Sequence, residues 1–491
     1  MNDLVTVDWL VLAPALAPVL GVVLVLVGDA AAPRRFGVVA LPLAALVLVV
    51  GAAFALSVSV GGGEVPVRTL CLPAPDGACL WSAGPRASTL QAVVLLAGAA
   101  ALALLHDGRP RPRDGAVSAT LLLAACTGGV AVAASRDVAT WLVALELATV
   151  PAVALVVLRG TRPAAHAGLS LLVTSLASFA LLVLAGALWL TATGDVLFSG
   201  EAAAAAWADP TRRAVLVLAV TVLLAGLGFK LSLVPFHAWT PQVYAGTDLG
   251  TTTFLAAASK VSAVAALLVV LEALTDLDGG PGVLAAVLAV PALASLLLGT
   301  VVALRQDDPV RLLAWSTIAQ SGWVLVPLTA FSAAGLRAAA AYVVVSAAAT
   351  TVALAVLVRT GARSLEETRG LLRRDPLAGG TLTFALLVLA GLPPGVVGLV
   401  VKIVALSPPV AAGVWPVVLV AVLAVVVGIA VYLRWVAVLL SRGEAPDDGP
   451  DAVDDGGRGR PRLATLAVIV LGTAVLVVTS ALPALLLAAS S

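Results

Sequence analysis

Long apolar runs separated by short polar segments dominate the sequence. A membrane-spanning helix needs about 20 consecutive apolar residues, and about fourteen runs of this kind remain when the chain is cut at its charges, Gly/Pro clusters and polar turns. We therefore predict an all-α polytopic membrane protein with about fourteen transmembrane helices. The candidate spans are residues 9–28, 37–60, 88–105, 116–134, 138–158, 167–192, 214–234, 248–272, 283–304, 311–330, 338–358, 378–404, 411–440 and 463–488.

Composition supports this interpretation. Hydrophobic residues make up 61% of the chain and charged residues 11%. The first apolar run has no basic segment before it and no small-residue cleavage site after it, so we expect a retained helix rather than a signal peptide. The net charge of +1 favours no particular partner, and we expect contact with the lipid bilayer and none with nucleic acid.

Arginines are distributed unequally between the two sets of loops. Alternate loops, beginning with residues 29–36, hold most of the arginines. The opposite loops hold only Arg68, Arg86, Arg136, Arg212, Arg213 and Arg337. Because cytoplasmic loops carry an excess of Lys and Arg, both termini are predicted to be extracytoplasmic.

The connecting segments leave no room for a soluble catalytic domain. The longest are residues 61–86, 193–213, 359–376 and 441–462, and the last is a polar Gly/Pro-rich stretch that we expect to be a flexible cytoplasmic loop. Cys71 and Cys79 share the first of these loops, and the spacing leaves a disulfide and two free thiols equally open.

Two apolar runs are interrupted by proline. VPFHAWTP follows Lys230 and contains Pro235, and GLPPGVVG precedes Lys402 and contains Pro393 and Pro394. Proline removes a backbone donor and breaks or kinks a helix. Interrupted spans at matching places in two halves of a chain indicate discontinuous helices at an inverted-repeat interface, where polar backbone lines a cavity.

The chain has three lysines, and all of them lie within apolar runs. Lysine can lose its proton when it is desolvated, whereas arginine stays charged. Lys260 is twelve residues from both Asp248 and Glu272, or about 18 Å along a helix, which is too far for its amine to reach an interface. Ionisable residues inside a membrane suggest a functional site, and titrating ones suggest proton transfer. A structural ammonium is the alternative for Lys260, and snorkelling to the interface is the alternative for Lys230 and Lys402.

Glu146 and His237 are the other candidates. Glu146 is the carboxylate near the middle of a long apolar run, and a buried carboxylate must pair or become protonated. A lysine is its expected partner, either as part of a proton relay or as a static salt bridge. His237 lies beside the first proline break and suits either a relay or a structural hydrogen bond.

Cofactor motifs are missing from the sequence. It contains no CxxC motif, no His pair at ligand spacing within a span and no glycine-rich phosphate loop. We therefore expect no cofactor or metal in this chain, and any redox centres in partner subunits.

At these residues the sequence resembles the antiporter-like membrane subunits of respiratory complex I, in particular the NADH-quinone oxidoreductase subunit N family. The resemblance extends from about residue 116 to residue 435. The matching segments are WLVALELATVPAVALV, GFKLSLVPFHAWTPQVYAG, SKVSAVAALL, DDPVRLLAWSTIAQSGW, SLEETRGLLRRDPLAGGTLTFALLVLAGLPPGVVG and YLRW.

The resemblance implies a fold and a set of roles. It implies two inverted five-helix repeats, residues 116–272 and 283–440, each with a discontinuous helix, preceded by three helices in 1–115 and followed by a C-terminal helix in 463–491. Glu146 and Lys230 would be the carboxylate–lysine pair, Lys260 the central lysine and Lys402 the lysine toward the output side. NADH, FMN, Fe–S clusters and quinone would be bound by partner subunits in a bacterial plasma membrane.

Some positions depart from the family pattern. The segment from Gly391 to Lys402 is one residue longer than usual, a change that rotates a helical side chain by about 100°. Two further interpretations therefore stay open. One is a subunit of a multisubunit Na⁺/H⁺ antiporter or membrane-bound hydrogenase, and the other is a non-pumping spacer of the membrane arm.

Overall fold

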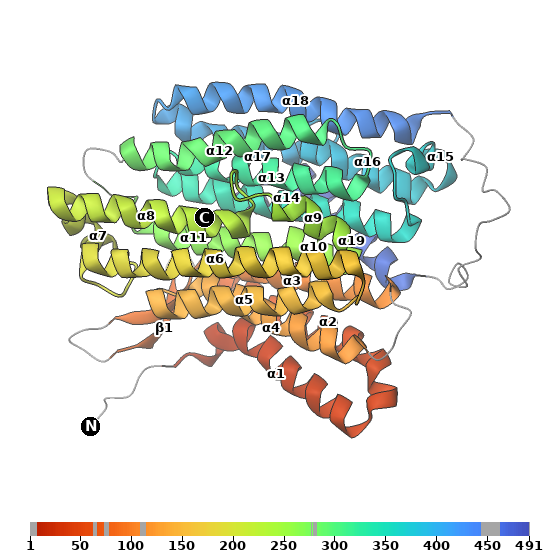
Figure 1. Ribbon diagram of the computed structural model, residues 1–491, viewed down its shortest axis with the longest axis horizontal. Helices are drawn as coiled ribbons and strands as arrows, with labels where there is room; N and C mark the ends of the chain where they lie inside the picture. The colour runs from red at the N-terminus through yellow and green to blue at the C-terminus, as the bar shows by residue number, and fades with distance from the viewer. Residues whose placement is uncertain are drawn as a thin grey trace.

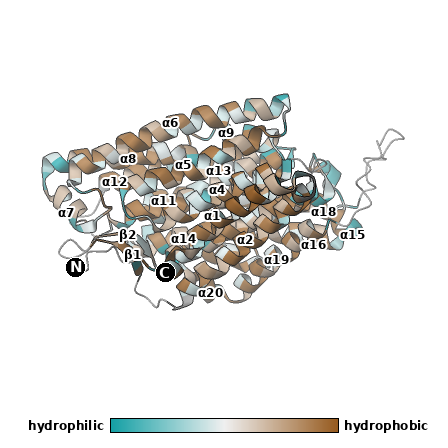
Figure 2. Cartoon of the chain, turned by 90° about the horizontal axis from the view of Figure 1, so that it is seen from below, coloured by the Kyte–Doolittle hydropathy of each residue, from teal (hydrophilic) through white to brown (hydrophobic). Residues whose placement is uncertain are grey.

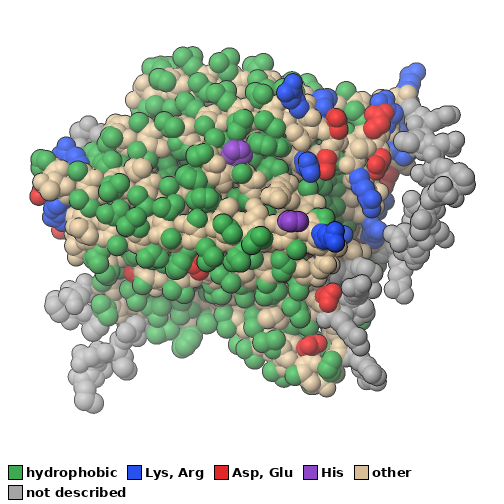
Figure 3. All heavy atoms as spheres, in the orientation of Figure 1, with side chains coloured by type: hydrophobic (Ala, Val, Ile, Leu, Met, Phe, Trp, Pro, Cys, Tyr) green, Lys and Arg blue, Asp and Glu red, His purple; other side chains and the backbone are tan. Residues whose placement is uncertain are grey.

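The structure is a computed structural model that describes residues 7–61, 66–72, 78–108, 114–275, 277, 282–442 and 462–490. The helices lie side by side with nearly parallel long axes (Figure 1). In the space-filling view, charged side chains gather toward the two ends of the molecule and hydrophobic side chains cover the band between them (Figure 3). This arrangement confirms the predicted all-α membrane architecture.

The elements follow the apolar runs closely. Up to the first proline break they are α1 (Trp9–Ala31), α2 (Pro33–Gly61), β1 (Val67–Cys71), β2 (Cys79–Ala83), α3 (Pro85–Gly108), α4 (Gly115–Ala134), α5 (Val138–Val157), α6 (Arg162–Thr193), α7 (Gly200–Ala208) and α8 (Pro210–Leu231). After it come α9 (Trp239–Gly246), α10 (Leu249–Ala256), α11 (Ala258–Glu272), α12 (Gly282–Ala303), α13 (Pro309–Leu328), α14 (Ala333–Thr360), η2 (Glu366–Thr368), α15 (Leu371–Arg374), α16 (Pro376–Ala390), α17 (Val396–Ala411), α18 (Trp415–Leu440), α19 (Leu463–Ala481) and α20 (Pro483–Ala489).

Within the described ranges, twelve helical segments are long and apolar enough to cross a membrane. They account for all but two of the predicted spans. One of the two is α13, which carries buried polar side chains such as Gln320 and Ser321. The other is the predicted span 378–404, which is divided into the shorter apolar helices α16 and α17.

Both predicted proline breaks are present. The helix that contains Lys230 ends at Leu231, and the chain becomes helical again at Trp239. The second break separates Ala390 from Val396. A local irregularity lies at Ala257, between α10 and α11. Residues 249–272 nevertheless form one apolar segment long enough to cross a membrane, as predicted.

Aspartate–proline pairs begin three of the helices in and around the breaks. The side chains of Asp209, Asp308 and Asp375 accept hydrogen bonds from first-turn backbone N–H groups of α8, α13 and α16. In each case proline follows at the first helical position, where its missing donor and fixed φ are tolerated. The starts of both broken helices are therefore fixed by the same local chemistry.

The loop between α2 and α3 forms a small β-hairpin that the helical pattern did not predict. Strands β1 and β2 pair antiparallel, and a Cys71–Cys79 disulfide joins them, which settles the open question in favour of the disulfide. At the end of α11, the Glu272 carboxylate forms ion pairs with Arg86 at 2.9 Å and with Arg136 at 2.7 Å. These contacts tie the end of α11 to α3 and to the α4–α5 connection.

The helices form successive layers along the chain. In Figure 1 the colour runs from α1 at the lower edge to α18 at the upper edge. After α18 the chain returns, and α19 packs against α3 and α14. The predicted loop 441–462 lies almost wholly outside the described residues.

Candidate functional site

Lys230 lies near the end of α8 and meets two side chains from α5. Its Nζ is 3.0 Å from Glu146 Oε1, and it donates a 2.6 Å hydrogen bond to Thr149 Oγ1. The lysine residue is only 9% exposed. The expected carboxylate–lysine pair is therefore formed, and the Lys230 amine is directed at α5 inside the protein.

Lys260 is held by the polar atoms that the first break exposes. Its Nζ donates to the backbone oxygen of Lys230 at 2.9 Å and also to Ser232 Oγ. Ser232 Oγ in turn shares a hydrogen bond with Thr240 Oγ1. An ammonium group complements the unpaired carbonyls at a helix C-terminus, so the end of α8 forms a natural site for this cation.

Trp239 connects the surroundings of the two lysines. The Lys260 amine lies 5.1 Å from the centre of the Trp239 ring, within cation–π range. The indole N–H of Trp239 donates to the Phe229 carbonyl at 2.7 Å. Trp239 also lines the cavity beside Lys230, so one rigid side chain contacts Lys260 and the space that Lys230 faces.

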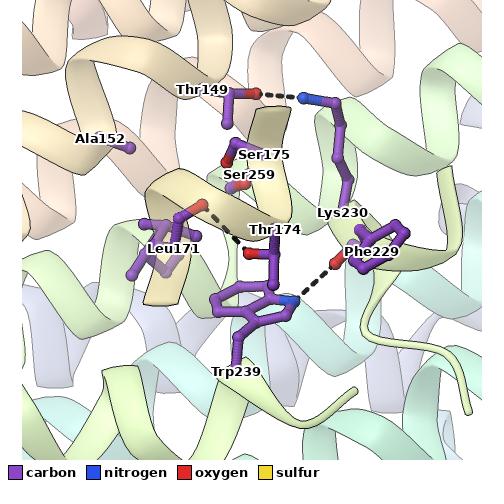
Figure 4. Close-up of a pocket in the computed structure, with 10 residues that line it drawn as sticks. Thr149, Ala152, Leu171, Thr174, Ser175, Phe229, Lys230, Trp239 and Ser259 are labelled. Carbon is purple, nitrogen blue, oxygen red and sulfur yellow. Dashed lines mark hydrogen bonds between the residues drawn. The ribbon is translucent and has the colours of Figure 1, made fainter. Parts of the chain in front are cut away.

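That cavity has a volume of about 20 Å³, enough to hold about one water molecule. Figure 4 shows the Lys230 amine directed at Thr149, with Ser175 and Ser259 among the residues that line the cavity. Hydroxyl groups both donate and accept hydrogen bonds. The space beside Lys230 is therefore polar enough to place a water in contact with its amine.

A second cavity of about 20 Å³ extends from Lys260 toward α13 and α14. Its polar lining residues after Lys260 are Thr317, Gln320, Ser321, Ser346 and Thr350. This cavity also has room for about one water. It joins the polar surroundings of Lys260 to those of Gln320.

Gln320 bridges two tyrosines in the second half of the chain. Its Nε2 donates to Tyr432 Oη at 2.9 Å, and its Oε1 accepts from Tyr342 Oη. Tyr432 Oη is also 2.6 Å from Ser316 Oγ. Tyr342 stacks on Trp323 with ring centres 5.9 Å apart. These buried groups continue the polar path beyond the second cavity.

Lys402 also lies beside Trp323. Its Nζ is 5.7 Å from the centre of the Trp323 ring and donates to the backbone oxygens of Leu389 at 2.9 Å and Ala390 at 2.6 Å. The residue is 6% exposed. Its amine therefore points into the second break, toward the carbonyl groups that end α16.

His237 lies apart from the lysine contacts. Its ring packs against Trp315 at 5.4 Å, and its buried Nδ1 has no hydrogen-bond partner in the described structure. None of the hydrogen bonds described above for the three lysines includes it. Its role as a relay stays a prediction.

Sequence reasoning pointed to Ser259, which lines the first cavity, but not to most of the other neutral side chains of this path. Thr149 is three residues after Glu146, so helical spacing places both on one face and was the available signal. Gln320 and Tyr432 lie within the quoted motifs RLLAWSTIAQSGW and YLRW, although neither residue type titrates near neutral pH. The roles of Trp239 and Ser232 depend on the shape of the break, which no spacing rule specifies.

No group of three or more His, Cys, Asp or Glu side chains suited to a metal ion occurs among the residues that the structure describes. The arrangement instead consists of amines, hydroxyls, one carboxylate and space for water. Groups of these kinds can pass protons along hydrogen bonds.

Comparison with known proteins identifies the family. The family described as "NADH:quinone oxidoreductase/Mrp antiporter, TM" matches residues 135–428. NADH-quinone oxidoreductase subunit N of Cereibacter sphaeroides is 37% identical over 405 residues, which are 82% of this chain and 86% of that protein. The subunit N of Salinispora tropica is 37% identical over 464 residues, 90% of this chain and 87% of that protein.

Two solved structures share the fold. A chain of respiratory complex I from Thermus thermophilus with bound aureothin matches with a TM-score of 0.78 and 28% identity, covering 96% of this chain and 98% of that chain. A chain of the Mrp complex from Dietzia sp. matches with a TM-score of 0.81 at 21% identity, covering 98% and 95%. The second likeness concerns the fold alone. From the family match and these relatives, the chain belongs to the NADH:quinone oxidoreductase/Mrp antiporter family and, within it, groups with the NADH-quinone oxidoreductase subunits N.

Proposed function

We propose that this chain is a proton-translocating, non-redox membrane subunit of an NADH:quinone oxidoreductase. The observation that carries the proposal is the buried series of polar groups from the Glu146–Lys230 pair, through Lys260 and the second cavity, to Gln320 and Lys402. Burying three amines is costly for a membrane protein. Their alignment with hydroxyls and water-sized cavities supports proton transfer as the reason for keeping them.

The first step of the proposed mechanism uses the ion pair. The Lys230 ammonium is stabilised by the Glu146 carboxylate 3.0 Å away. When a proton arrives on Glu146, the carboxylate loses its charge and Lys230 holds its own proton less tightly. The Lys230 ammonium, which donates to Thr149 Oγ1, can then give up a proton to a water in the first cavity, and the amine is left neutral.

The later steps use the surroundings of Lys260 and Lys402. Lys260 is tied to the backbone of Lys230, so a change at the first pair alters the position of the atoms that hold the second amine. From Lys260, a water in the second cavity leads to Gln320 and its tyrosines. Lys402 is the proposed terminal amine on the output side.

The remaining assignments are part of the same proposal. The quinone, NADH, FMN and Fe–S centres belong to partner subunits, and quinone reduction there drives protonation changes here. The chain lies in a bacterial plasma membrane with both termini extracytoplasmic, as the arginine distribution supports. The two stretches 116–272 and 283–440 are proposed to be inverted repeats.

An antiporter subunit is the second candidate, because the matching family also includes Mrp antiporters. Relatives that are 33% to 37% identical over the matched residues are named as NADH-quinone oxidoreductase subunits N, which favours the first candidate. Genes for redox subunits beside this one would support the oxidoreductase, and their absence would support the antiporter.

The decisive experiment compares Lys260→Ala and Lys260→Arg with the native chain. Proton pumping and NADH-driven quinone reduction are measured together in membrane vesicles that contain the assembled complex. Val269→Ala, a buried substitution in the same helix, controls for loss of packing. We expect both lysine variants to assemble and lose most of their pumping, while Val269→Ala retains it.

The arginine variant separates a proton carrier from a fixed charge. Arginine keeps a positive charge but does not deprotonate in proteins. Full pumping by Lys260→Arg would therefore show that the path avoids a titrating amine at this position, and would favour the spacer interpretation or another route.

A further inference from the structure

An indole hydrogen bond joins the two helices that carry Glu146 and Lys260. The Nε1–H of Trp141 in α5 donates to the backbone oxygen of Ala266 in α11 at 3.1 Å. Trp141 is 1% exposed and Ala266 is fully buried. A carbonyl oxygen has two lone pairs, so one inside a helix can accept this N–H in addition to its intrahelical bond. Neither residue belongs to the series of polar groups that forms the candidate path.

The other side chains of α11 contribute little that would fix its position along α5. Between Lys260 and Glu272 they are apolar except for Ser262, whose Oγ donates to the Ala258 oxygen of its own helix. α5 packs against α11 in a mainly hydrophobic part of the bundle (Figure 2). Membrane helices gain no hydrophobic driving force from such contacts, whereas a hydrogen bond between helices requires a narrow range of distance and angle. The Trp141 bond is therefore suited to setting the register of the two helices.

An ion pair at the ends of the same two helices shows what that register is. Arg136 lies just before α5, and Glu272 is the last residue of α11; the two side chains pair at 2.7 Å. Trp141 comes five residues after Arg136, and Ala266 comes six residues before Glu272. The two helices therefore run in opposite directions and stay in step between these contacts.

One further step in the same register leads to the candidate path. Glu146 comes five residues after Trp141, and Lys260 comes six residues before Ala266. These steps measure about 7.5 and 9 Å along a helix, so Glu146 and Lys260 lie at nearly the same depth. The contacts of Lys230 agree with this placement, because its amine pairs with Glu146 and its backbone oxygen accepts from Lys260.

We propose that Trp141 is a positioning residue for proton transfer, a role that rests on the function proposed above. Its hydrogen bond to Ala266 holds α11 in register with α5 and so keeps the Lys260 amine on the backbone that presents Lys230 to Glu146. Without this bond α11 is free to shift along α5. A change at the Glu146–Lys230 pair then reaches Lys260 less effectively.

Trp189 of α6 provides a matched control in the same cluster of rings. It is also 1% exposed, and both tryptophans meet the Phe198 ring edge to face, at 5.7 Å for Trp141 and 5.3 Å for Trp189. The Trp189 N–H likewise donates to a carbonyl at 3.1 Å, but the acceptor is Leu197, between α6 and α7. Phenylalanine at either position removes one indole N–H and a similar volume, and only the change at Trp141 releases α11.

The test measures protons pumped per NADH oxidised by the assembled complex in membrane vesicles. The contribution of this chain is the difference between the native complex and Lys260→Ala. We expect Trp141→Phe to lose about half of this contribution or more, and Trp189→Phe to retain it. The unfolding temperature should fall by a similar amount in both tryptophan variants, so that the difference in pumping does not come from stability.

A tryptophan analogue separates the hydrogen bond from the packing. Benzothienylalanine has the shape of tryptophan with sulfur in place of the N–H, so at position 141 it keeps the contact with Phe198 and removes only the donor. We expect the analogue to reduce pumping at position 141 and to leave it unchanged at position 189.

Two results would overturn the proposal. One is full pumping with the analogue at position 141, and the other is an equal loss from the changes at Trp141 and Trp189. Full pumping by Lys260→Ala would overturn the proposed function and the role of Trp141 together. A deficit in Lys260→Ala with none in Trp141→Phe would overturn the role of Trp141 alone.

Discussion

The two proline breaks bind a lysine in the same way but surround it differently. At each break the carbonyl groups that end the first half-helix accept hydrogen bonds from a lysine amine. Lys260 binds the oxygen of Lys230 at the end of α8, and Lys402 binds those of Leu389 and Ala390 at the end of α16. In this respect Lys402 corresponds to Lys260. The sequence does not suggest this match, because Lys402 lies in the interrupted run itself, whereas Lys260 lies in the apolar run that follows one.

The difference lies in the neighbouring helix. Beside the first break, α5 supplies the carboxylate of Glu146, which pairs with Lys230. Beside the second break, α13 supplies the amide of Gln320, which bonds two tyrosines. An amide can orient hydroxyls but cannot change charge. The first break therefore has a neighbouring group whose charge can change on protonation, whereas the neighbouring group at the second break is a neutral amide.

The residue that directly follows the first half-helix also differs between the two breaks. The residue after α8 is Ser232, with a left-handed φ of 61°, and the residue after α16 is Gly391, with a φ of 79°. Glycine adopts this conformation freely, whereas serine does so at a cost. Ser232 contributes the hydroxyl that binds Lys260, and Gly391 leaves the space in which a Cβ would lie 3.0 Å from Lys402 Cδ. Each residue suits the way its break holds the amine.

The largest predicted effect concerns the Glu146–Lys230 pair. Removing one member leaves a charge without its partner in a largely buried site, so Glu146→Leu and Lys230→Met should each cost about 3 kcal/mol of stability. The double variant should recover most of that loss because neither charge remains. Thermal unfolding of the purified complexes measures the stability, and all three variants should fail to pump.

An exposed pair provides the control for this prediction. Arg434 and Asp307 are 3.3 Å apart, and the Asp307 side chain is 87% exposed. Pairs of this kind contribute about 0–1 kcal/mol, so Asp307→Asn should leave the complex nearly unchanged. If the Glu146/Lys230 double variant is as unstable as the sum of the single variants, the two residues are not coupled and the contrast between the breaks fails.

Much of the fold followed from the sequence because its signals are local. Apolar runs specify membrane helices, and Pro235 and Pro394 mark breaks that the structure contains. The irregularity at Ala257 escaped prediction because TTTFLAAASK has no proline or glycine to mark it. The paired strands at residues 67–71 and 79–83 were missed because short strands in a polar loop give a weak pattern.

The candidate site was predictable to the extent that it depends on charge. A buried carboxylate needs a partner, and the sequence offers only three lysines, so the pairing of Glu146 with one of them was expected. The choice of Lys230, the carbonyl ligands of Lys260 and Lys402, and the placement of Trp239 follow from how the helices pack. No spacing in the sequence encodes those contacts.

A smaller effect is expected at Lys402. Lys402→Met leaves the carbonyls of Leu389 and Ala390 without their donor, which should cost about 1–3 kcal/mol. None of the hydrogen bonds and ion pairs given for Lys402 includes a carboxylate, so no compensating substitution should be needed for assembly. Measurements of assembled complex and of pumping should show near-normal assembly with lost pumping. Assembly of Lys402→Met only when a carboxylate elsewhere is neutralised as well would contradict the difference between the two breaks.

The smallest effect separates the starts of the two broken helices. Asp375 caps α16 and also binds Arg359 at 2.8 Å, whereas Asp209 caps α8 through backbone N–H groups and is exposed. Burial alone would raise the pKa of Asp375, but hydrogen bonds from the Ala378 N–H and from Arg359 lower it below its ordinary value. Asp375→Asn should therefore cost about 1 kcal/mol at neutral pH, and Asp209→Asn less.

The depressed pKa of Asp375 fixes the direction of the pH dependence. Because the folded protein favours the charged carboxylate, its contribution is complete above the ordinary pKa of about 4 and is lost as the pH falls through the folded value. The difference in unfolding temperature between the native complex and Asp375→Asn should be constant from pH 7 to about pH 5 and should shrink below about pH 4. A difference that instead grows on acidification would mean that the Arg359 contact does not stabilise the ionised form. The start of α16 would then be held, like that of α8, by its backbone cap alone.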